Sequence, residues 1–211
     1  MAGRKVIALD QVQTTKDKLI EAVGRVLARD GFGSIDAASV AAEAGFDKRI
    51  LIRHFGCLSN LVAAFGQSPE FWPSSQELLQ GQAEDLKQMP AGQVVATFFK
   101  RYVAALRQRP QTLEILSWEM RERNELAGQL DDIRVRTALE FFEHIETDIP
   151  ESPDLTAVVA LMAGAVTYFL LRSRTSRFFG GFDFSDEADW QRLEKGIDDL
   201  LKESLCGATA K

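Results

Sequence analysis

Basic side chains gather in one short segment of the chain, AGFDKRILIRHFG, which spans residues 44–56. Lys and Arg donate hydrogen bonds to phosphate oxygens, and in the major groove of DNA they can pair with O6 and N7 of guanine. Asp47 stands just before these residues, where its carboxylate can cap a helix that begins at residue 48. The segment predicts a short helix that presents basic groups to nucleic acid. These groups are Lys48, Arg49, Arg53 and His54.

Two apolar residues, Ile50 and Ile52, lie among the basic groups. An isoleucine supplies neither a hydrogen bond nor a charge to DNA, and a helix that reads DNA usually carries polar groups at such positions. A generic pair of short helices with solvated Lys and Arg would show the same basic residues. Both interpretations stay open on these residues alone.

The elements around the segment are predicted to be helical. Apolar residues recur at helical spacing over 14–30, and Gly31 is placed to end that helix. A short alanine-rich helix is expected over 36–45, with Asp36 as its N-cap and Gly45 just past its end. Two short helices that meet at a glycine have the layout of a helix-turn-helix, whose second helix enters the major groove.

The rest of the chain also predicts helices. Apolar faces with helical spacing mark four longer helices, near residues 94–106, 126–145, 153–174 and 190–201. Residues 68–92 contain three prolines and two glycines, so a loop broken by short helical pieces is expected there. The segment FFGGFDFSDE, residues 178–187, is expected to be an interhelical loop, because no hairpin signal stands out. The fold class is therefore all-α, with about nine helices.

Charge is spread unevenly along the 211 residues, whose formal net charge is −6. Residues 1–55 hold nine Lys and Arg against seven Asp and Glu, and residues 56–211 hold 16 against 24. This distribution fits a small nucleic-acid reader joined to an acidic body, although so small an excess also arises by chance. Cys57 and Cys206 fit no metal spacing, so free thiols in a reducing compartment are expected.

Motifs of other classes of protein are missing from the sequence. There are only two histidines, no glycine-rich phosphate loop and no pair of cysteines at ligand spacing, so no enzyme, cofactor or metal is expected. No N-terminal signal peptide is predicted. The most apolar segment, residues 155–171, is at the short edge for a bilayer span, and a buried helix is favoured over membrane insertion. The expected location is the cytoplasm.

Residues 31–65, GFGSIDAASVAAEAGFDKRILIRHFGCLSNLVAAF, resemble the TetR family of transcriptional regulators. The family pattern is a Gly-Phe turn, a short helix ending in Ala-Gly, a recognition helix closing in Tyr-x-His-Phe, and a Leu-rich helix. Most of the matching positions are packing positions, so they support the fold more strongly than the function. They are Gly31, Phe32, Val40, Ala41, Ala44, Gly45, Leu51, His54, Phe55, Gly56, Leu61 and Phe65.

The resemblance implies a helix-turn-helix DNA-binding domain over residues 1–56 and a helical ligand-binding and dimerisation domain over 57–211. It implies a homodimer through helices at about 154–175 and 187–205, a double-stranded DNA operator and a small apolar or amphipathic effector, most simply for a repressor. The residues expected to bind DNA are Arg4, Lys5, Lys16, Asp47, Lys48, Arg49, Arg53 and His54.

Departures from the family pattern fall on its polar positions. Asp36 stands where a Thr is common, Ile52 aligns with the Tyr that touches a phosphate, and Leu58 aligns with a Lys that does the same; Ala37 and Ile50 replace positions that are often polar. Phosphate contacts supply most non-specific affinity for DNA. The alternative function is therefore a ligand-binding or scaffold protein of this fold whose DNA binding is weakened or lost.

An effector site is expected between the central helices of the larger domain. Single aromatic residues at helical spacing are more often part of a core than of a pocket, and a half-exposed histidine is the simpler interpretation of His144. The candidate lining residues are Phe98, Tyr102, Trp118, Phe141, His144, Tyr168 and Arg172.

Overall fold

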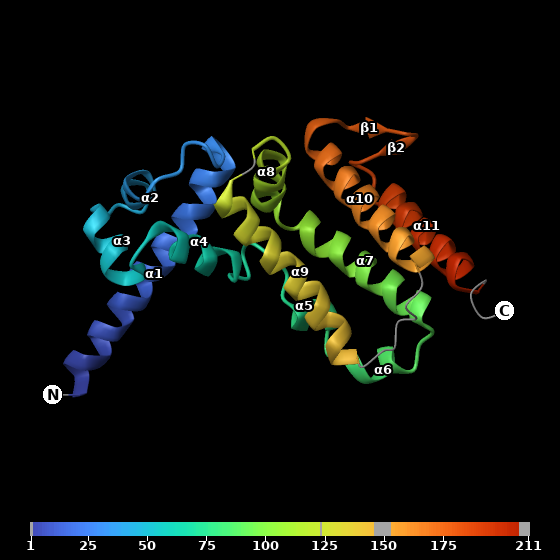
Figure 1. The fold of residues 1–211 in the computed structure, drawn as a ribbon, viewed down its shortest axis with the longest axis horizontal. Helices are drawn as coiled ribbons and strands as arrows, with labels where there is room; N and C mark the ends of the chain where they lie inside the picture. The colour runs from blue at the N-terminus through green and yellow to red at the C-terminus, as the bar shows by residue number, and fades with distance from the viewer. Residues whose placement is uncertain (1, 123, 146–152, 207–211) are drawn as a thin grey trace. The chain divides into compact units, whose positions relative to one another are not determined.

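Helices make up most of the chain in the computed structural model (Figure 1). The structure describes the backbone of residues 2–122, 124–145 and 153–206 and the side chains of residues 13–122, 124–145 and 157–202. Eleven helices and one two-stranded hairpin lie within these residues, which confirms the all-α class. The chain forms two compact units: Met1–Trp72 with Glu114–Val135, and Pro73–Leu113 with Arg136–Lys211.

The first unit is built around a long N-terminal helix. It contains α1 (Ala2–Asp30), α2 (Ala37–Glu43), α3 (Lys48–Phe55), α4 (Leu58–Gly66), the C-terminal part of α8 (Pro110–Glu119) and the N-terminal part of α9 (Glu125–Ile145). Helix α1 packs on α2 and α4, and α3 packs on both of these shorter helices. Leu19, Leu27, Leu51 and Leu61 are completely buried, so the apolar stripe of α1 forms the core of the unit, as its periodicity predicts.

The second unit has α7 at its centre. It contains α5 (Ser75–Leu79), α6 (Ala83–Lys87), α7 (Ala91–Arg107), the C-terminal part of α9, α10 (Pro153–Thr175), β1 (Phe178–Phe179), β2 (Phe182–Asp183) and α11 (Glu187–Cys206). Helix α7 packs on α5, α10 and α11. Two ion pairs join α7 to α11: Lys100 Nζ lies 2.9 Å from Asp198, and Arg107 lies 2.6 Å from Glu187.

Two details differ from the expectations. The helices α5 and α6 raise the count among the described residues to eleven, and both are short pieces inside the segment expected to be an interrupted loop. The expectation that no hairpin forms is wrong, because Phe178 pairs with Asp183 and Phe179 with Phe182. Gly180 and Gly181 have φ of 58° and 84°, the positive values that a two-residue type I′ hairpin turn requires.

Helix α10 is the one described helix long and apolar enough to cross a bilayer, over Ala157–Thr175, and only 17% of that window is buried inside the chain. The buried residues Met162, Val166 and Leu170 lie on one side of the helix, which packs on α7 and α11. Length and composition alone are weak evidence for a membrane span. The expectation of a buried helix is wrong, because most of this window is not covered by the rest of the chain.

Candidate nucleic-acid interface

The turn between α2 and α3 reverses the chain at a glycine. Gly45 has φ +77°, and its N–H donates to Ala42 O at 3.0 Å, while the N–H of Phe46 donates to Ala41 O at 2.8 Å. These bonds satisfy the last carbonyls of α2 in the manner of a Schellman motif. The sequence predicts this turn correctly, because glycine adopts positive φ without strain.

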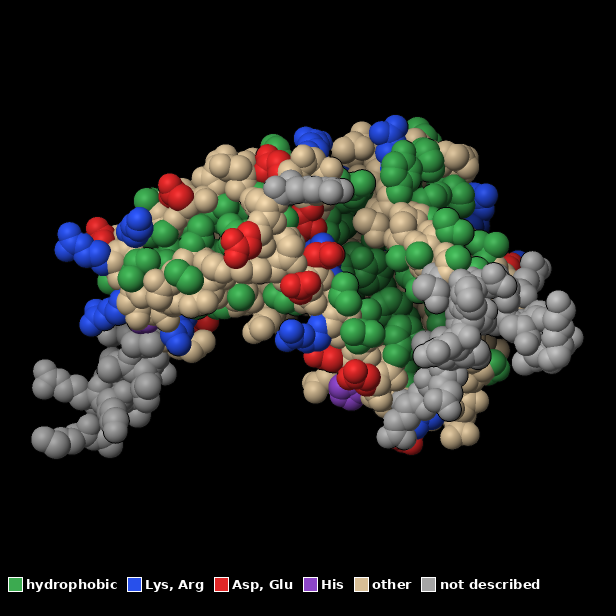
Figure 2. Space-filling model, viewed as in Figure 1, with side chains coloured by type: hydrophobic (Ala, Val, Ile, Leu, Met, Phe, Trp, Pro, Cys, Tyr) green, Lys and Arg blue, Asp and Glu red, His purple; other side chains and the backbone are tan. Residues whose placement is uncertain are grey.

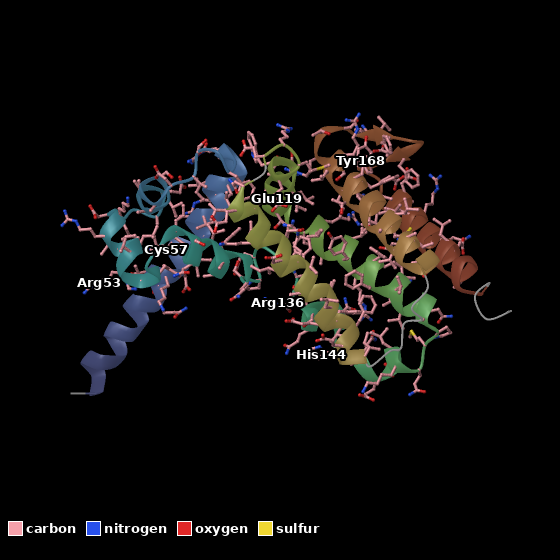
Figure 3. All side chains as sticks on the ribbon, viewed as in Figure 1. Arg53, Cys57, Glu119, Arg136, His144 and Tyr168 are labelled. Atoms are coloured by element: carbon pink, nitrogen blue, oxygen red, sulfur yellow. The ribbon has the colours of Figure 1, made fainter. Side chains whose placement is uncertain are left out.

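Helix α3 begins at the N-cap Asp47, whose carboxylate accepts a hydrogen bond from the N–H of Arg49 at 2.8 Å. Leu51 is completely buried and anchors the helix against its neighbours. Lys48, Arg49, Ile52 and Arg53 are exposed, and we call these four residues the reading face. Arg53 points away from the helices, and basic side chains surround this end of the unit (Figures 2 and 3).

The residues expected to bind DNA differ in how exposed their side chains are. Arg49 is 94% exposed and 3.7 Å from Asp47, a loose contact that leaves its guanidinium accessible. His54 is half-buried in the last turn of α3, and Lys16 is half-buried on α1. Arg4 and Lys5 belong to the first turns of α1, and their side chains are outside the described residues.

A fixed negative charge stands at the start of α2. Asp36 accepts hydrogen bonds from the N–H groups of Ala38 at 2.8 Å and Ser39 at 2.7 Å, and the hydroxyl of Ser39 receives the N–H of Asp36 in return. The bonds from Ser39 and Ala38 lower the pKa of Asp36. The carboxylate therefore stays ionised near neutral pH, and it repels any phosphate that approaches this helix terminus.

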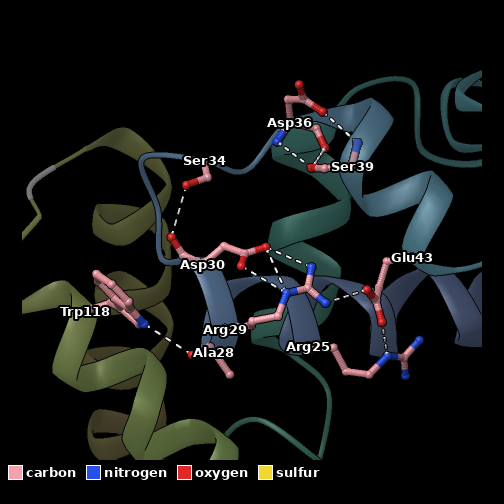
Figure 4. A network of polar contacts seen from close by, with 9 residues as sticks. All are labelled: Arg25, Ala28, Arg29, Asp30, Ser34, Asp36, Ser39, Glu43 and Trp118. Atoms are coloured by element: carbon pink, nitrogen blue, oxygen red, sulfur yellow. Dashed lines mark hydrogen bonds and ion pairs between the residues drawn. The ribbon is translucent and has the colours of Figure 1, made fainter.

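Two basic side chains near the C-terminal end of α1 are engaged within the protein (Figure 4). Glu43 of α2 accepts hydrogen bonds from Arg29 at 2.8 Å and Arg25 at 2.9 Å, and Arg29 also bonds Asp30. The bonds from Arg29 and then Arg25 lower the pKa of Glu43. Because these two arginines already face carboxylates, they are less available to DNA than the exposed cations of α3.

Four apolar residues stand where the family pattern has polar ones, and all four lie at least partly at the surface. Ile52 is 43% exposed, whereas Ile50, Ala37 and Leu58 are half-buried. Leu58 is the first residue of α4, and the N-cap Cys57 makes no side-chain capping bond. Cys57 is an exposed free cysteine, as expected, and Cys206 lies outside the residues whose side chains are described.

Two residues of the first unit that support the helix-turn-helix have no signal in the sequence. Glu122 accepts hydrogen bonds at 2.7 Å from the N–H groups of both Phe32 and Gly33, in the turn between α1 and α2. The indole N–H of Trp118 donates to Ala28 O at 3.2 Å. Each pair is separated by about 90 positions, so no local pattern could indicate it.

Aromatic rings from α7 and α9 pack together in the second unit. The ring of Phe98 lies 5.1 Å from Phe141, 5.3 Å from Phe142 and 6.0 Å from Tyr102, measured between centroids. Phe98 and Phe141 are buried, and Tyr102 is half-buried. The structure thus brings together three of the residues expected to line an effector site, as a cluster of contacting rings.

The other residues expected at the effector site lie apart from this cluster. His144, Tyr168 and Arg172 are exposed, and Trp118 belongs to the first unit. Nδ1 of His144 lies 2.6 Å from Glu140 O, in the preceding turn of the same helix. A shallow indentation lies elsewhere, between α10, the hairpin and α11, and it has no interior room for a water molecule. No group of three potential metal ligands occurs among the described residues.

No protein-family model matches the sequence, and no curated protein matches it. Solved structures match its fold. A TetR family transcription regulator from Marinobacter aquaeolei superposes with a TM-score of 0.58 at 11% identity, over 94% of this chain and 97% of that one. NalD, the secondary repressor of the MexAB-OprM multidrug efflux pump in Pseudomonas aeruginosa, gives 0.62 at 15%, over 92% and 97%.

FadR from Bacillus subtilis, solved in complex with stearoyl-CoA, gives a TM-score of 0.57 at 16% identity, over 87% of this chain and 96% of that one. The resemblance to the TetR family is therefore confirmed at the level of the fold, over nearly the whole chain. These similar structures are transcription regulators rather than enzymes.

Proposed function

We propose that the protein is a DNA-binding transcriptional regulator, acting in the cytoplasm as a homodimer and, most simply, as a repressor. The observation that carries this proposal is the reading face: Lys48, Arg49 and Arg53 are exposed on a helix that follows a glycine turn. The major groove is wide enough for an α-helix, and the N-terminal turn of α3 holds two of the three basic groups.

This proposal assigns a separate role to each of two parts of the chain. Residues 1–56 supply DNA binding, and residues 57–211 supply effector binding and dimerisation. A dimer suits a single short recognition helix, because two half-sites are needed for affinity and specificity. The proposed effector is a small apolar or amphipathic molecule, in keeping with the apolar character of Phe98, Tyr102 and Phe141. Its binding would favour a dimer whose two recognition helices are wrongly spaced for the operator.

The dimer surface we propose is the outward side of α10, together with α11. Ala157, Gly164 and Tyr168, with the adjacent pair Ala160 and Leu161, lie three or four residues apart and are all exposed, with Leu161 at 73% and Tyr168 at 47%. Leu200 of α11 is 57% exposed, and hydrophobic side chains gather over this part of the second unit (Figure 2). A contiguous apolar stripe of this kind marks an interaction surface, and small residues let two helices approach closely.

A second candidate function is a ligand-binding or scaffold protein of the same fold without DNA binding. It is favoured by the apolar residues Ile52 and Leu58 and by the ionised Asp36, since each replaces or opposes a phosphate contact. Phosphate contacts dominate non-specific affinity, so these replacements weaken the hold on any duplex.

Binding of the full chain to duplex DNA at several salt concentrations separates the two functions. A regulator binds some sequence specifically, with an affinity that falls steeply as salt rises. Lys48→Ala and Arg49→Ala weaken that binding, whereas Arg136→Ala, which removes an exposed cation of α9 outside the proposed dimer surface, leaves it unchanged. If no duplex, including the DNA flanking the gene, binds at low salt without effector, the regulator is excluded and the second function stands.

A further inference from the structure

Ile52 is an exposed apolar side chain in the middle of the reading face. It is 43% exposed, although the other three residues of that face are charged. Lys48 and Arg49 lie four and three residues before it, one helical turn away on the same side of α3. Any duplex held by these cations must therefore meet Ile52 as well.

The major groove offers an aliphatic side chain one complementary group. Guanine, adenine and cytosine present hydrogen-bond donors and acceptors there, and thymine alone adds a C5-methyl group. A phosphate, which the aligned tyrosine of the TetR pattern touches, offers Ile52 no comparable contact, because it needs charge or hydrogen bonds. The chemistry of the side chain therefore selects one base among four.

We propose that Ile52 is a specificity-determining residue that packs against the C5-methyl group of a thymine in each half-site. The inference rests on the proposed function, and it names the chemistry that the reading face recognises. Lys48 and Arg49 supply attraction and pair with phosphates or guanine, while Ile52 adds an apolar contact at one position. Cytosine at that position would lack the methyl and would place its N4 amino group against a side chain that cannot accept a hydrogen bond.

Burial distinguishes Ile52 from its neighbour. Ile50 is half-buried and lies beside the completely buried Leu51, so its side chain contributes to the packing of α3. Ile52 lies with the exposed cations, so its methyl groups are available to DNA without any change in the fold. The two isoleucines are thus a matched pair with the same chemistry and different exposure.

The experiment uses the full-length protein and DNA that the protein itself selects. A random-sequence duplex pool is enriched on the protein, and the selected duplex is resynthesised with deoxyuridine replacing thymidine at one position per half-site at a time. Uracil keeps the base pair and loses only the methyl group. At one position the wild type should lose affinity about fourfold per half-site, the factor that corresponds to one buried methyl group.

The variant Ile52→Ala should bind both duplexes equally at that position. The matched control Ile50→Ala should keep the thymine preference of the wild type, and Ile50→Val serves in its place if the alanine variant unfolds. If no thymine-to-uracil change weakens binding, or if Ile52→Ala keeps the preference, the inference is overturned while the proposed function stands. If no duplex is enriched or bound at low salt, the proposed function falls and this inference falls with it.

Discussion

The guanidinium of Arg134 lies 2.8 Å from the carboxylate of Glu119, and both side chains are mostly shielded, with 15% and 10% of their surfaces exposed. Arg134 also lies 2.8 Å from Asp131, whose side chain is 65% exposed, and 5.6 Å from the ring of Trp72. This contact joins the end of α8 to the start of α9 within the first unit, close in sequence to Trp118 and Glu122, which support the helix-turn-helix.

Removing the cation should destabilise the protein much more than removing an exposed one. Arg134→Met leaves Glu119 buried without its partner, and loss of one member of a buried pair costs about 3–5 kcal/mol. Arg136→Met is the control, because Arg136 is exposed on the same helix (Figure 3) and its removal should change stability by less than about 0.5 kcal/mol. Urea unfolding at neutral pH measures both, and equal losses would contradict the structural role of the buried pair.

The same site predicts a pH dependence. Burial raises the pKa of Glu119 above its ordinary value of 4.5, although Arg134 acts in the opposite direction. A raised carboxyl pKa favours the protonated form in the folded state. The stability from this group is therefore complete below pH 4.5 and is lost as pH rises through the raised value. Arg134→Met should enlarge that loss, and adding Glu119→Gln should abolish it. A parallel pH profile for all three proteins would refute this assignment.

Two glycines with nearly equal backbone angles should respond differently to alanine. Gly31 has φ +74°, and an added Cβ would lie 2.8 Å from the ring of Trp118; Gly45 has φ +77° with nothing within 4 Å. Gly45→Ala should cost about 1–2 kcal/mol from the backbone conformation alone. Gly31→Ala should cost more because it adds a steric overlap with the ring. Equal unfolding free energies for the two variants would show that Trp118 moves aside freely.

The sequence predicts the local features of the first unit well. The ends of α1 and α2, the turn at Gly45 and the caps Asp36 and Asp47 follow from glycine and aspartate chemistry within a few residues, and the structure confirms them. The start of α1 at Ala2 is not predicted, because the apolar periodicity begins only near residue 14. The hairpin is missed because its strands are two residues long, too short for an alternating pattern.

Contacts between residues far apart in the sequence could not be predicted. The bonds of Glu122 to Phe32 and Gly33 close a gap of about 90 residues, and nothing in either segment indicates the other. The exposure of individual side chains in a short helix could not be predicted from the sequence either. Ile50 and Ile52 are the same residue type two positions apart. Only the packing of α3 shows that Ile50 is half-buried and that Ile52 lies on the reading face.

The outward side of α10 should control assembly. Leu161→Glu places a charge in the middle of the proposed dimer surface, where it would be buried without a partner, so the dimer should dissociate to monomers. Leu139→Glu is the control. Leu139 is 57% exposed and Leu161 is 73% exposed, but Leu139 lies on α9, outside the proposed dimer surface. Sedimentation velocity of the two variants and the wild type makes the comparison. A wild type that is monomeric at high concentration, or a Leu161→Glu variant that stays dimeric, rules out this surface.

Leu58 offers a way to restore a missing phosphate contact. Its position at the start of α4 aligns with a lysine in the TetR pattern, and the side chain is half-buried at the surface. Leu58→Lys should therefore strengthen binding to all duplexes alike and steepen the slope of log affinity against log salt by about 0.9 per subunit, because one more phosphate is neutralised. Sequence preference should not change, since phosphate contacts carry no base information.

The control variant is Gln67→Lys. Gln67 is exposed just after the end of the same helix, so this substitution adds the same charge away from α3. If both variants raise affinity equally, general charge rather than a phosphate contact explains the gain, and the placement of α4 beside the duplex is wrong.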